Sequence, residues 1–334
     1  MRTRARWLLL LGLVLLVVIL ASVAVGAVWL DPVEVVRALG ATGSSPSDSV
    51  ARTIVFEIRL PRALLAACVG AGLAAAGTAY QGLFRNPLAE PFVVGAASGA
   101  ALGATLAIVT GWQGPVPELL SPVPFGAFVG AVISATLTYG LSAVVRSESV
   151  VGLLLTGIAV ATLLNAAVWV LMTWNDQDLA RIVAWLMGSL SGRGWSDLSH
   201  IWPWLAVGGA GVWLLSRPLD ALAEGEETAR GLGLRVRIAT GSIVGLASLA
   251  TAAAVAAGGI IGFVGLIAPH IARRLVGETH AWLVPASALL GAALLVLADT
   301  AARTITAPVE LPVGVVTAAL AGPFFLYLLG RRRA

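Results

Sequence analysis

The sequence predicts an all-α polytopic membrane protein, and three observations carry that prediction. Of 334 residues, 58% are hydrophobic and only 11% are charged, which suits lipid-embedded helices and exceeds what a soluble domain needs. The apolar residues form long unbroken runs, whereas barrel strands show short alternating segments. Each helical crossing takes about 20 apolar residues, so we expect about ten transmembrane helices in a single domain covering residues 1–334.

The predicted spans are the apolar runs between polar or Pro-rich breaks. In chain order they are 8–30, 61–83, 92–110, 124–145, 150–172, 195–215, 238–257, 259–272, 281–299 and 312–330. The first is interpreted as uncleaved, because its apolar run exceeds the roughly 7 to 15 residues of a signal-peptide core; cleavage between 21 and 27 is the alternative. The eighth is too short to cross alone and is expected to be a partial helix packed inside the bundle.

Arginine sets the predicted orientation. All 21 basic residues are arginine, and an even number of spans puts both termini on one side. With that side cytoplasmic, inner segments hold fourteen arginines and outer segments seven, as the positive-inside rule requires. We therefore predict a multi-pass protein of the cell (inner, cytoplasmic) membrane with both termini in the cytoplasm.

Several function classes lack the residues they need. A P-loop requires lysine, and this chain has none, so ATP hydrolysis by the chain itself is excluded. The sequence contains no G-x-S-x-G or H-E-x-x-H motif, and no catalytic residue is predicted. Cys68 is the single cysteine and the three histidines are scattered, so no metal site is predicted. No basic stripe with interleaved aromatic residues suggests nucleic-acid binding.

Small residues recur at four-residue spacing in GAGLAAAG (70–77) and GAASGAALGA (95–104). Such faces let helices approach closely in lipid, so these segments predict tight bundle packing. AGLAAAGTAYQGLFRNP also loosely echoes AAAVAAGGIIGFVGLIAP. The echo suggests that spans two to five and seven to ten are inverted repeats, which run in opposite directions through a membrane.

The segment 216–237, SRPLDALAEGEETARGLGLRVR, is polar and lies between two predicted spans. We expect two short helices that meet at Gly225. Glu226 and Glu227 fall in the first turn of the second helix, where the helix dipole favours acids, and Gly231 and Gly233 fall where it should end. A rigid polar knob of this kind is suited to contact another protein; an ordinary solvated loop is the alternative.

Four motifs follow in order: RLPRALLAA (59–67), QGLFRNPLAEPFVVGAASG (81–99), GIIGFVGLIAPHIARR (259–274) and ADTAARTITAPVELPVG (298–314). Together they resemble the permease subunits of the type II ABC importers for vitamin B12, iron–siderophores and haem. The resemblance runs from about residue 55 to the end of the chain. It implies the type II ABC importer permease fold and transport of a metal chelate, with ferric siderophore favoured over haem and cobalamin.

The resemblance also implies partners. These are a second copy of the chain, two ABC ATPase subunits and an extracytoplasmic substrate-binding protein, all within a lipid bilayer. No cofactor is expected on this chain, because ATP and Mg are used by the partner ATPase. An ion-gradient-driven secondary transporter is the alternative function, although no ionisable residue is predicted at mid-span where such a transporter needs one. A structural or signalling subunit is a third possibility.

Residue roles follow from the same resemblance. Glu227, Ala229 and Gly233 match the E-x-A-x-x-x-G kernel of importer coupling loops. The predicted ATPase-coupling residues are Leu219, Asp220, Ala221, Leu222, Gly225, Glu226, Glu227, Ala229, Arg230 and Gly233.

Two further groups are assigned by resemblance to the outer surface and the translocation path. Arg59, Arg62 and Arg303 match family positions that pair with glutamates of the binding protein; snorkelling or lipid-headgroup contact is the alternative. The predicted path and gate residues lie in the cytoplasmic turn before the fifth span and in the outer segment after it. They are Ser147, Glu148, Ser149, Met187, Gly188 and Ser189.

Overall fold

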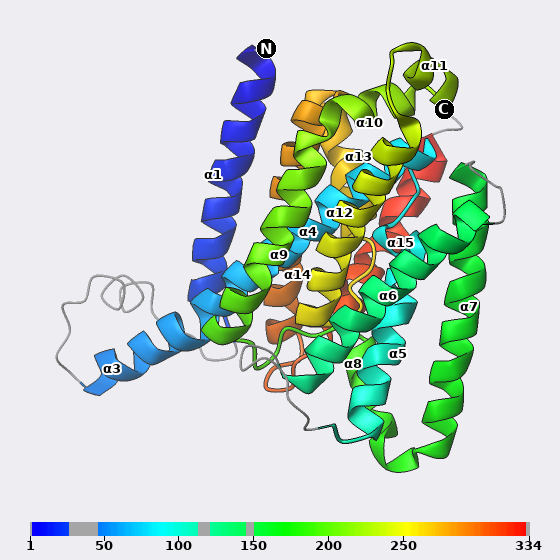
Figure 1. The fold of residues 1–334 in the computed structure, drawn as a ribbon. Coiled ribbons are helices and arrows are strands. Elements are labelled where there is room, and N and C mark those ends of the chain that lie inside the picture. The colour runs from blue at the N-terminus through cyan, green and yellow to red at the C-terminus, as the bar shows by residue number, and fades with distance from the viewer. Residues whose placement is uncertain (1, 27–45, 113–120, 145–149, 332–334) are drawn as a thin grey trace.

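The computed structural model describes residues 2–26, 46–112, 121–144 and 150–331. Within these ranges the regular elements are all helices. Figure 1 shows them packed side by side, with the start of α1, the end of α15 and the pair α10–α11 all at one end of the molecule. The predicted placement of both terminal helices and the polar segment on one side is therefore confirmed for the described residues.

Each of the ten predicted spans has a helix at its place. These helices are α1 (Arg2–Ala24), α4 (Leu60–Phe84), α5 (Ala96–Val109), α6 (Pro122–Val144), α7 (Val150–Trp174), α9 (Trp195–Leu214), α12 (Val236–Gly258), α13 (Val264–Val276), α14 (His280–Thr304) and α15 (Val313–Arg331). Shorter elements are α3 (Pro46–Thr53), a π-helix (Ile54–Arg59), α8 (Leu179–Leu186), α10 (Ser216–Ala223), α11 (Glu226–Gly231) and two 3-10 turns (Pro91–Val94, Asp176–Asp178).

Not every one of the ten helices is long enough to cross a membrane alone. In the described part of the chain, six helices are long and apolar enough to do so, or seven if α9 and α10, bent by 56°, form one span. Helix α5 has 14 residues and α13 has 13, about two thirds of a full crossing. The expectation of a partial helix at 259–272 is confirmed for α13, and α5 is its counterpart in the first half of the chain.

The second span begins earlier than predicted. The motif RLPR does not open it, because the end of α3, the π-helix and α4 form one continuous 35-residue helix, Val50–Phe84. Pro61 does not interrupt this stretch, because the π-helix that ends just before it is a local adjustment of the kind that lets a membrane helix accept proline. Arg59 and Arg62 consequently lie within a long helix.

The chain directions agree with inverted repeats. In Figure 1, α4 climbs toward the end that carries α10 and α11, whereas α12 descends away from it. Each is followed by a short return and a helix too short to cross a membrane alone, α5 or α13. The two returns meet, because the Glu90 carboxylate accepts a hydrogen bond from the Phe263 N–H at 3.2 Å. Phe263, at φ 69°, is the N-cap of α13, so a carboxylate lies at the positive end of this helix.

Glycines set the spacing of the central helices. A Cβ on Gly70 of α4 would lie 2.2 Å from the carbonyl oxygen of Gly291 of α14, and one on Gly99 of α5 would lie 2.3 Å from that of Gly130 of α6. The predicted close packing of GAGLAAAG and GAASGAALGA is therefore confirmed. Backbone contact of this kind replaces side-chain interdigitation and holds helix pairs at short range.

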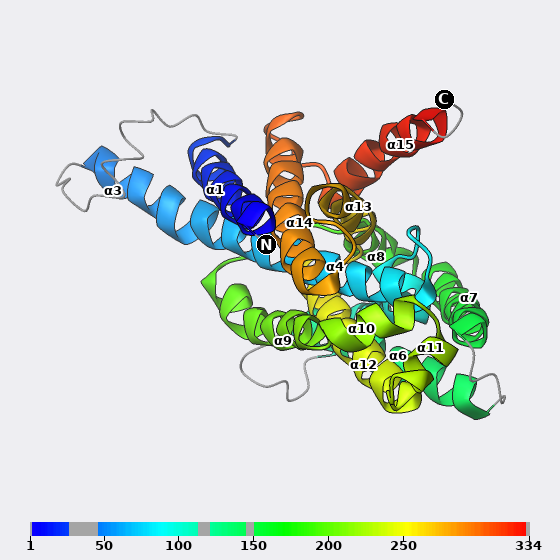
Figure 2. The same ribbon diagram turned by 90° about the horizontal axis from the view of Figure 1, so that it is seen from above.

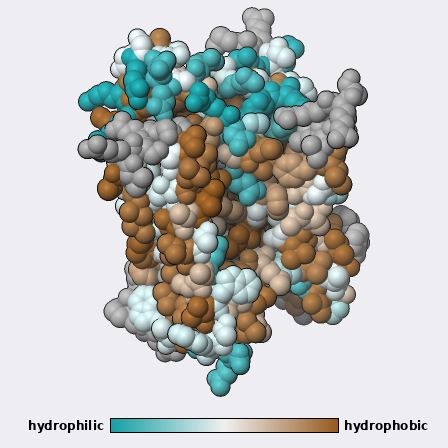
Figure 3. All heavy atoms as spheres, turned by 90° about the vertical axis from the view of Figure 1, so that its right-hand side faces the viewer, coloured by the Kyte–Doolittle hydropathy of each residue, from teal (hydrophilic) through white to brown (hydrophobic). Residues whose placement is uncertain are grey.

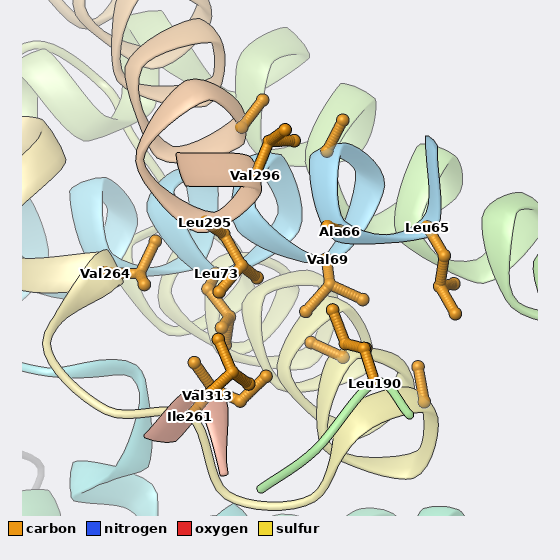
Figure 4. Close-up of a cluster of buried hydrophobic side chains, with 14 of the residues drawn as sticks. Leu65, Ala66, Val69, Leu73, Leu190, Ile261, Val264, Leu295, Val296 and Val313 are labelled. Atoms are coloured by element: carbon orange, nitrogen blue, oxygen red, sulfur yellow. The ribbon is translucent and has the colours of Figure 1, made fainter. Parts of the chain in front are cut away.

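The main core lies where α4 and α14 meet. Figure 4 shows Val69 and Leu73 of α4 beside Leu295 of α14, with Leu190, Ile261 and Val313 below them. The outer face differs: Figure 3 shows a hydrophilic cap at the α10–α11 end above a broad hydrophobic belt. An exposed apolar belt is what a lipid-facing surface requires.

Candidate functional site

The polar segment folds into the two short helices predicted for it. Helix α10 covers Ser216–Ala223 and α11 covers Glu226–Gly231, and they meet at Gly225, whose φ of 120° favours glycine. The chain turns again at Gly233, which has a φ of 80°. We call residues 216–233 the platform. Figures 1 and 2 place it at the end of the bundle that also carries the start of α1.

One face of the platform is anchored in the bundle. Leu219, Leu222 and Ala229 are buried and belong to the same core cluster as Tyr80 and Leu83 of α4. These three predicted coupling residues therefore fix the platform to the membrane helices and present no side chain to an external partner. Because the anchor is apolar, it holds the platform with the same burial that stabilises the bundle.

The opposite face of the platform is exposed. Glu227 and Arg230 face solvent, and Arg230 pairs with Glu226 across one helical turn at 3.2 Å. Leu232 follows, with 73% of its surface exposed. The sequence analysis did not single out Leu232; a large apolar residue between two glycines, directly after a helix, was the available signal. We call residues 227–233 the platform tip.

Asp220 connects α10 to α14. Its Oδ1 accepts hydrogen bonds from the backbone N–H of His280 at 2.9 Å and from His280 Nδ1 at 2.6 Å. His280 is buried, whereas the Asp220 side chain is partly exposed. The sequence placed Asp220 in the coupling loop but gave His280 no role, because sixty residues separate the two.

A cluster of charged residues lies at the opposite end of the bundle. Arg62 of α4 donates through Nη2 to Asp299 of α14 at 2.8 Å and through Nη1 to Glu310 at 2.9 Å. Arg303 approaches the second Asp299 oxygen at 3.4 Å. Asp299 is fully buried. We call Arg62, Asp299, Arg303 and Glu310 the arginine cluster.

Two of the arginines also hold the end of α1. Arg59 donates to the carbonyl oxygens of Val23 and Ala24 at 3.0 and 2.9 Å. Arg303 donates to the carbonyl and hydroxyl oxygens of Ser22 at 2.9 and 2.7 Å. The three predicted docking arginines are thus 5 to 6% exposed and bonded to groups of this chain. Sequence reasoning missed their acceptors, so their role as a docking surface stays a prediction.

The predicted gate residues fall into two groups. Ser147, Glu148 and Ser149 lie outside the described residues. Met187 is exposed, whereas Gly188 is buried with a φ of 71°. Ser189 donates its N–H to the Gly258 carbonyl oxygen at 2.7 Å, so residues 187–189 join α8 to the end of α12. Their gate role stays a prediction.

Within the described ranges, no group of three or more His, Cys, Asp or Glu side chains is placed to hold a metal ion. The described features are a lipid-facing helical bundle with two short helices at repeat positions, and a platform anchored on one face and exposed on the other. They define a polytopic membrane transport subunit with an exposed polar platform at one end.

The comparison with known families agrees with that class. The chain matches the FecCD transport family over residues 14–331, and it belongs to this family.

Relatives and solved structures match along nearly the whole length. The Fe(3+)-citrate import system permease protein YfmE of Bacillus subtilis is 41% identical over 96% of this chain and 93% of its own. The hemin transport system permease protein HmuU of Yersinia pestis is 45% identical over 84% of each chain. A solved structure of a transporter assigned to the metal-chelate type of ABC transporter, in an inward-facing conformation, matches with a TM-score of 0.85. It is 32% identical and the match covers 98% of this chain and 99% of that one.

Proposed function

We propose that the chain is the permease subunit of an ATP-driven ABC importer and forms the translocation path for a metal chelate. The observation that carries this proposal is the platform: two short helices with an apolar anchor in the bundle and an exposed tip. Because the chain has no lysine for a P-loop, energy has to come from a separate subunit, and the platform tip is the surface on which an ATPase docks.

The partner assignment follows from this role. Two ATPase subunits, which use ATP and Mg, bind the platforms of two copies of the chain, and an extracytoplasmic binding protein delivers cargo at the other end. The shared end of α1, α15 and the platform supports a cytoplasmic placement of both termini in the inner membrane, as does the arginine distribution. No cofactor is assigned to this chain.

The cargo is proposed to be a ferric chelate, with a siderophore first and haem or cobalamin next. Relatives named for iron(3+)-citrate and for hemin match along most of the chain, which supports the class of metal chelates rather than one member. Binding-protein capture followed by mass spectrometry of the bound ligand distinguishes the three cargoes.

Arg59, Arg62 and Arg303 are the proposed docking point for the binding protein. A glutamate of that protein would exchange with Glu310 on Arg62, because the Glu310 side chain is 31% exposed whereas that of Asp299 is 1% exposed. The path is proposed to run past residues 147–149 and past Met187, Gly188 and Ser189. Charge reversal at Arg62 is expected to weaken the stimulation of ATP hydrolysis by the binding protein; unchanged stimulation would remove this assignment.

The proposal is tested in proteoliposomes that contain the chain and the ATPase encoded with it. With binding protein and cargo outside, we expect uptake that requires ATP and stops with a non-hydrolysable analogue. Liposomes with the chain alone, under a proton or sodium gradient, are the control. Accumulation by the chain alone would instead establish an ion-gradient-driven secondary transporter and overturn the proposal.

A further inference from the structure

We propose that α14 carries motion between the two ends of the molecule, and that the Asp220–His280 contact is the joint through which it moves the platform. In this assignment His280 and Gly82 are positioning residues for energy coupling. The inference rests on the proposed function, since it takes the platform to be the surface that an ATPase contacts.

The joint fixes both the backbone and the side chain of α14. His280 is the first residue of this helix, so its N–H has no partner within the helix. Asp220 Oδ1 accepts that N–H at 2.9 Å and the ring Nδ1 at 2.6 Å. A carboxylate at a helix N-terminus is also favoured by the helix dipole. Movement of α14 along or around its axis therefore acts on α10 directly.

Gly82 of α4 makes the space that the joint needs. The His280 ring is buried against α4, and a Cβ on Gly82 would lie 2.4 Å from His280 Nε2. Nε2 has no hydrogen-bond partner in the part of the chain that the structure describes. The ring is thus placed by Asp220 on one side and by the missing side chain of Gly82 on the other, where α4, α10 and α14 meet.

The far end of α14 belongs to the arginine cluster. Asp299 lies nineteen residues beyond His280, about 28 Å along the axis at about 1.5 Å per residue. Between these points, Gly291 touches Gly70 of α4 at backbone distance. Helix α14 therefore runs from the cluster to the platform (Figure 1), and a change at Arg62–Asp299 is delivered to α10 through a continuous series of packed contacts.

The first arm of the test measures ATP hydrolysis by the reconstituted complex with and without loaded binding protein. The readout is the ratio of stimulated to basal hydrolysis in each variant, because this ratio separates a loss of coupling from a loss of ATPase docking. We expect His280→Ala and Gly82→Ala to reduce the ratio of stimulated to basal hydrolysis at least fivefold. His280→Asn keeps a donor for Asp220 and should stay within twofold of the parent, as should the control Glu278→Ala, which removes an exposed acid from the turn before α14.

The second arm needs no partner protein. Hydrogen–deuterium exchange is measured on the full chain in lipid nanodiscs, and we expect His280→Ala to speed amide exchange in residues 216–223 at least tenfold, with Glu278→Ala unchanged. Parent-like stimulation in His280→Ala would overturn the inference, and so would unaltered exchange. Equal loss in His280→Ala and His280→Asn would also overturn it, because the ring would then act by packing. A parent complex without ATP-dependent uptake would instead count against the proposed function, and the exchange arm would still decide whether α14 holds the platform.

Discussion

The two ends of the bundle use arginine in opposite ways. At the platform, Arg230 is exposed and pairs with Glu226 across one helical turn. At the other end, Arg62 is buried and pairs with Asp299 and Glu310. A surface ion pair contributes little to stability and leaves both side chains free to contact a partner. A buried pair is costly to break, because removing one member leaves an unpaired charge away from water.

This difference separates residues that are available to bind a partner protein from residues that hold the helices of the bundle together. The platform buries Leu219, Leu222 and Ala229 and exposes Leu232 beside its charged residues, so its anchor and its contact surface are made of different side chains. The arginine cluster ties α1, α4 and α14 together. Any carboxylate that docks there has to replace an internal partner, so at that end the same side chains serve docking and helix packing. At the platform, the exposed side chains of the tip are separate from the buried ones that anchor it.

The largest expected effect is at Asp299, which lies between Arg62 and Arg303. Asp299→Ala leaves two buried guanidinium groups without this acid, and we expect it to lower the free energy of unfolding by about 3–5 kcal/mol. The measurement is reversible unfolding of the purified chain in detergent, followed by tryptophan fluorescence.

The matched control for Asp299 is Asp178→Ala, which removes the acid of the exposed Arg181–Asp178 pair. We expect this control to change stability by about 0–1 kcal/mol. Similar losses in the two variants would contradict the distinction between buried and exposed charge drawn above.

Much of this arrangement could be predicted from the sequence, and the reason is local. Hydrophobic runs, glycine spacing and helix-end signals act over a few residues, so the ten helices and the meeting of α10 and α11 at Gly225 followed from the sequence. The opposite directions of α4 and α12 followed from the sequence similarity between the two halves of the chain.

Two of the missed features are long-range pairings. Arg62 and Asp299 are 237 residues apart, and nothing near Arg62 reveals that acid, so the resemblance alone assigned the arginine an exposed, outward role. His280 was treated as an isolated histidine for the same reason. Leu232 was overlooked because an apolar residue in an apolar chain is informative only once its exposure is known.

The next effect concerns the platform tip. Leu232→Asp should weaken association with the ATPase at least tenfold, because burying a leucine contributes about 1.5–3 kcal/mol and tenfold corresponds to about 1.4 kcal/mol. Leu232→Met keeps the apolar contact and should bind like the parent. Both variants should unfold like the parent, since Leu232 is exposed. Parent-like affinity of Leu232→Asp, measured by titration of labelled ATPase onto the chain in nanodiscs, would place the docking surface elsewhere.

Glu90 is an acid that belongs to neither the platform nor the arginine cluster, and its carboxylate accepts a hydrogen bond from the Phe263 N–H. Burial raises the pKa of the Glu90 carboxyl, and the hydrogen bond from the Phe263 N–H opposes that shift. Since the folded pKa lies above the ordinary value of about 4.3, the charged carboxylate costs stability as pH rises through this window. Glu90→Gln keeps the acceptor without the charge.

The expected result for Glu90→Gln is unchanged stability at pH 4 and stability at pH 7 that equals or exceeds the parent. Thermal unfolding at the two pH values measures it. A variant that is less stable than the parent at pH 7 would mean that the negative charge at the start of α13 outweighs its burial.

The smallest expected effect is at Arg230, and it tests the recognition side of the comparison. Arg230→Ala removes the exposed ion pair between Arg230 and Glu226, which are one helical turn apart. We therefore expect the free energy of unfolding to change by about 0.5 kcal/mol or less. Because the side chain faces the proposed partner, the same variant should slow association with the ATPase, and raising the salt concentration should reduce the difference from the parent. Stopped-flow association at two ionic strengths measures both quantities. A salt-independent loss accompanied by a large drop in stability would show that Arg230, like Arg62, holds the fold.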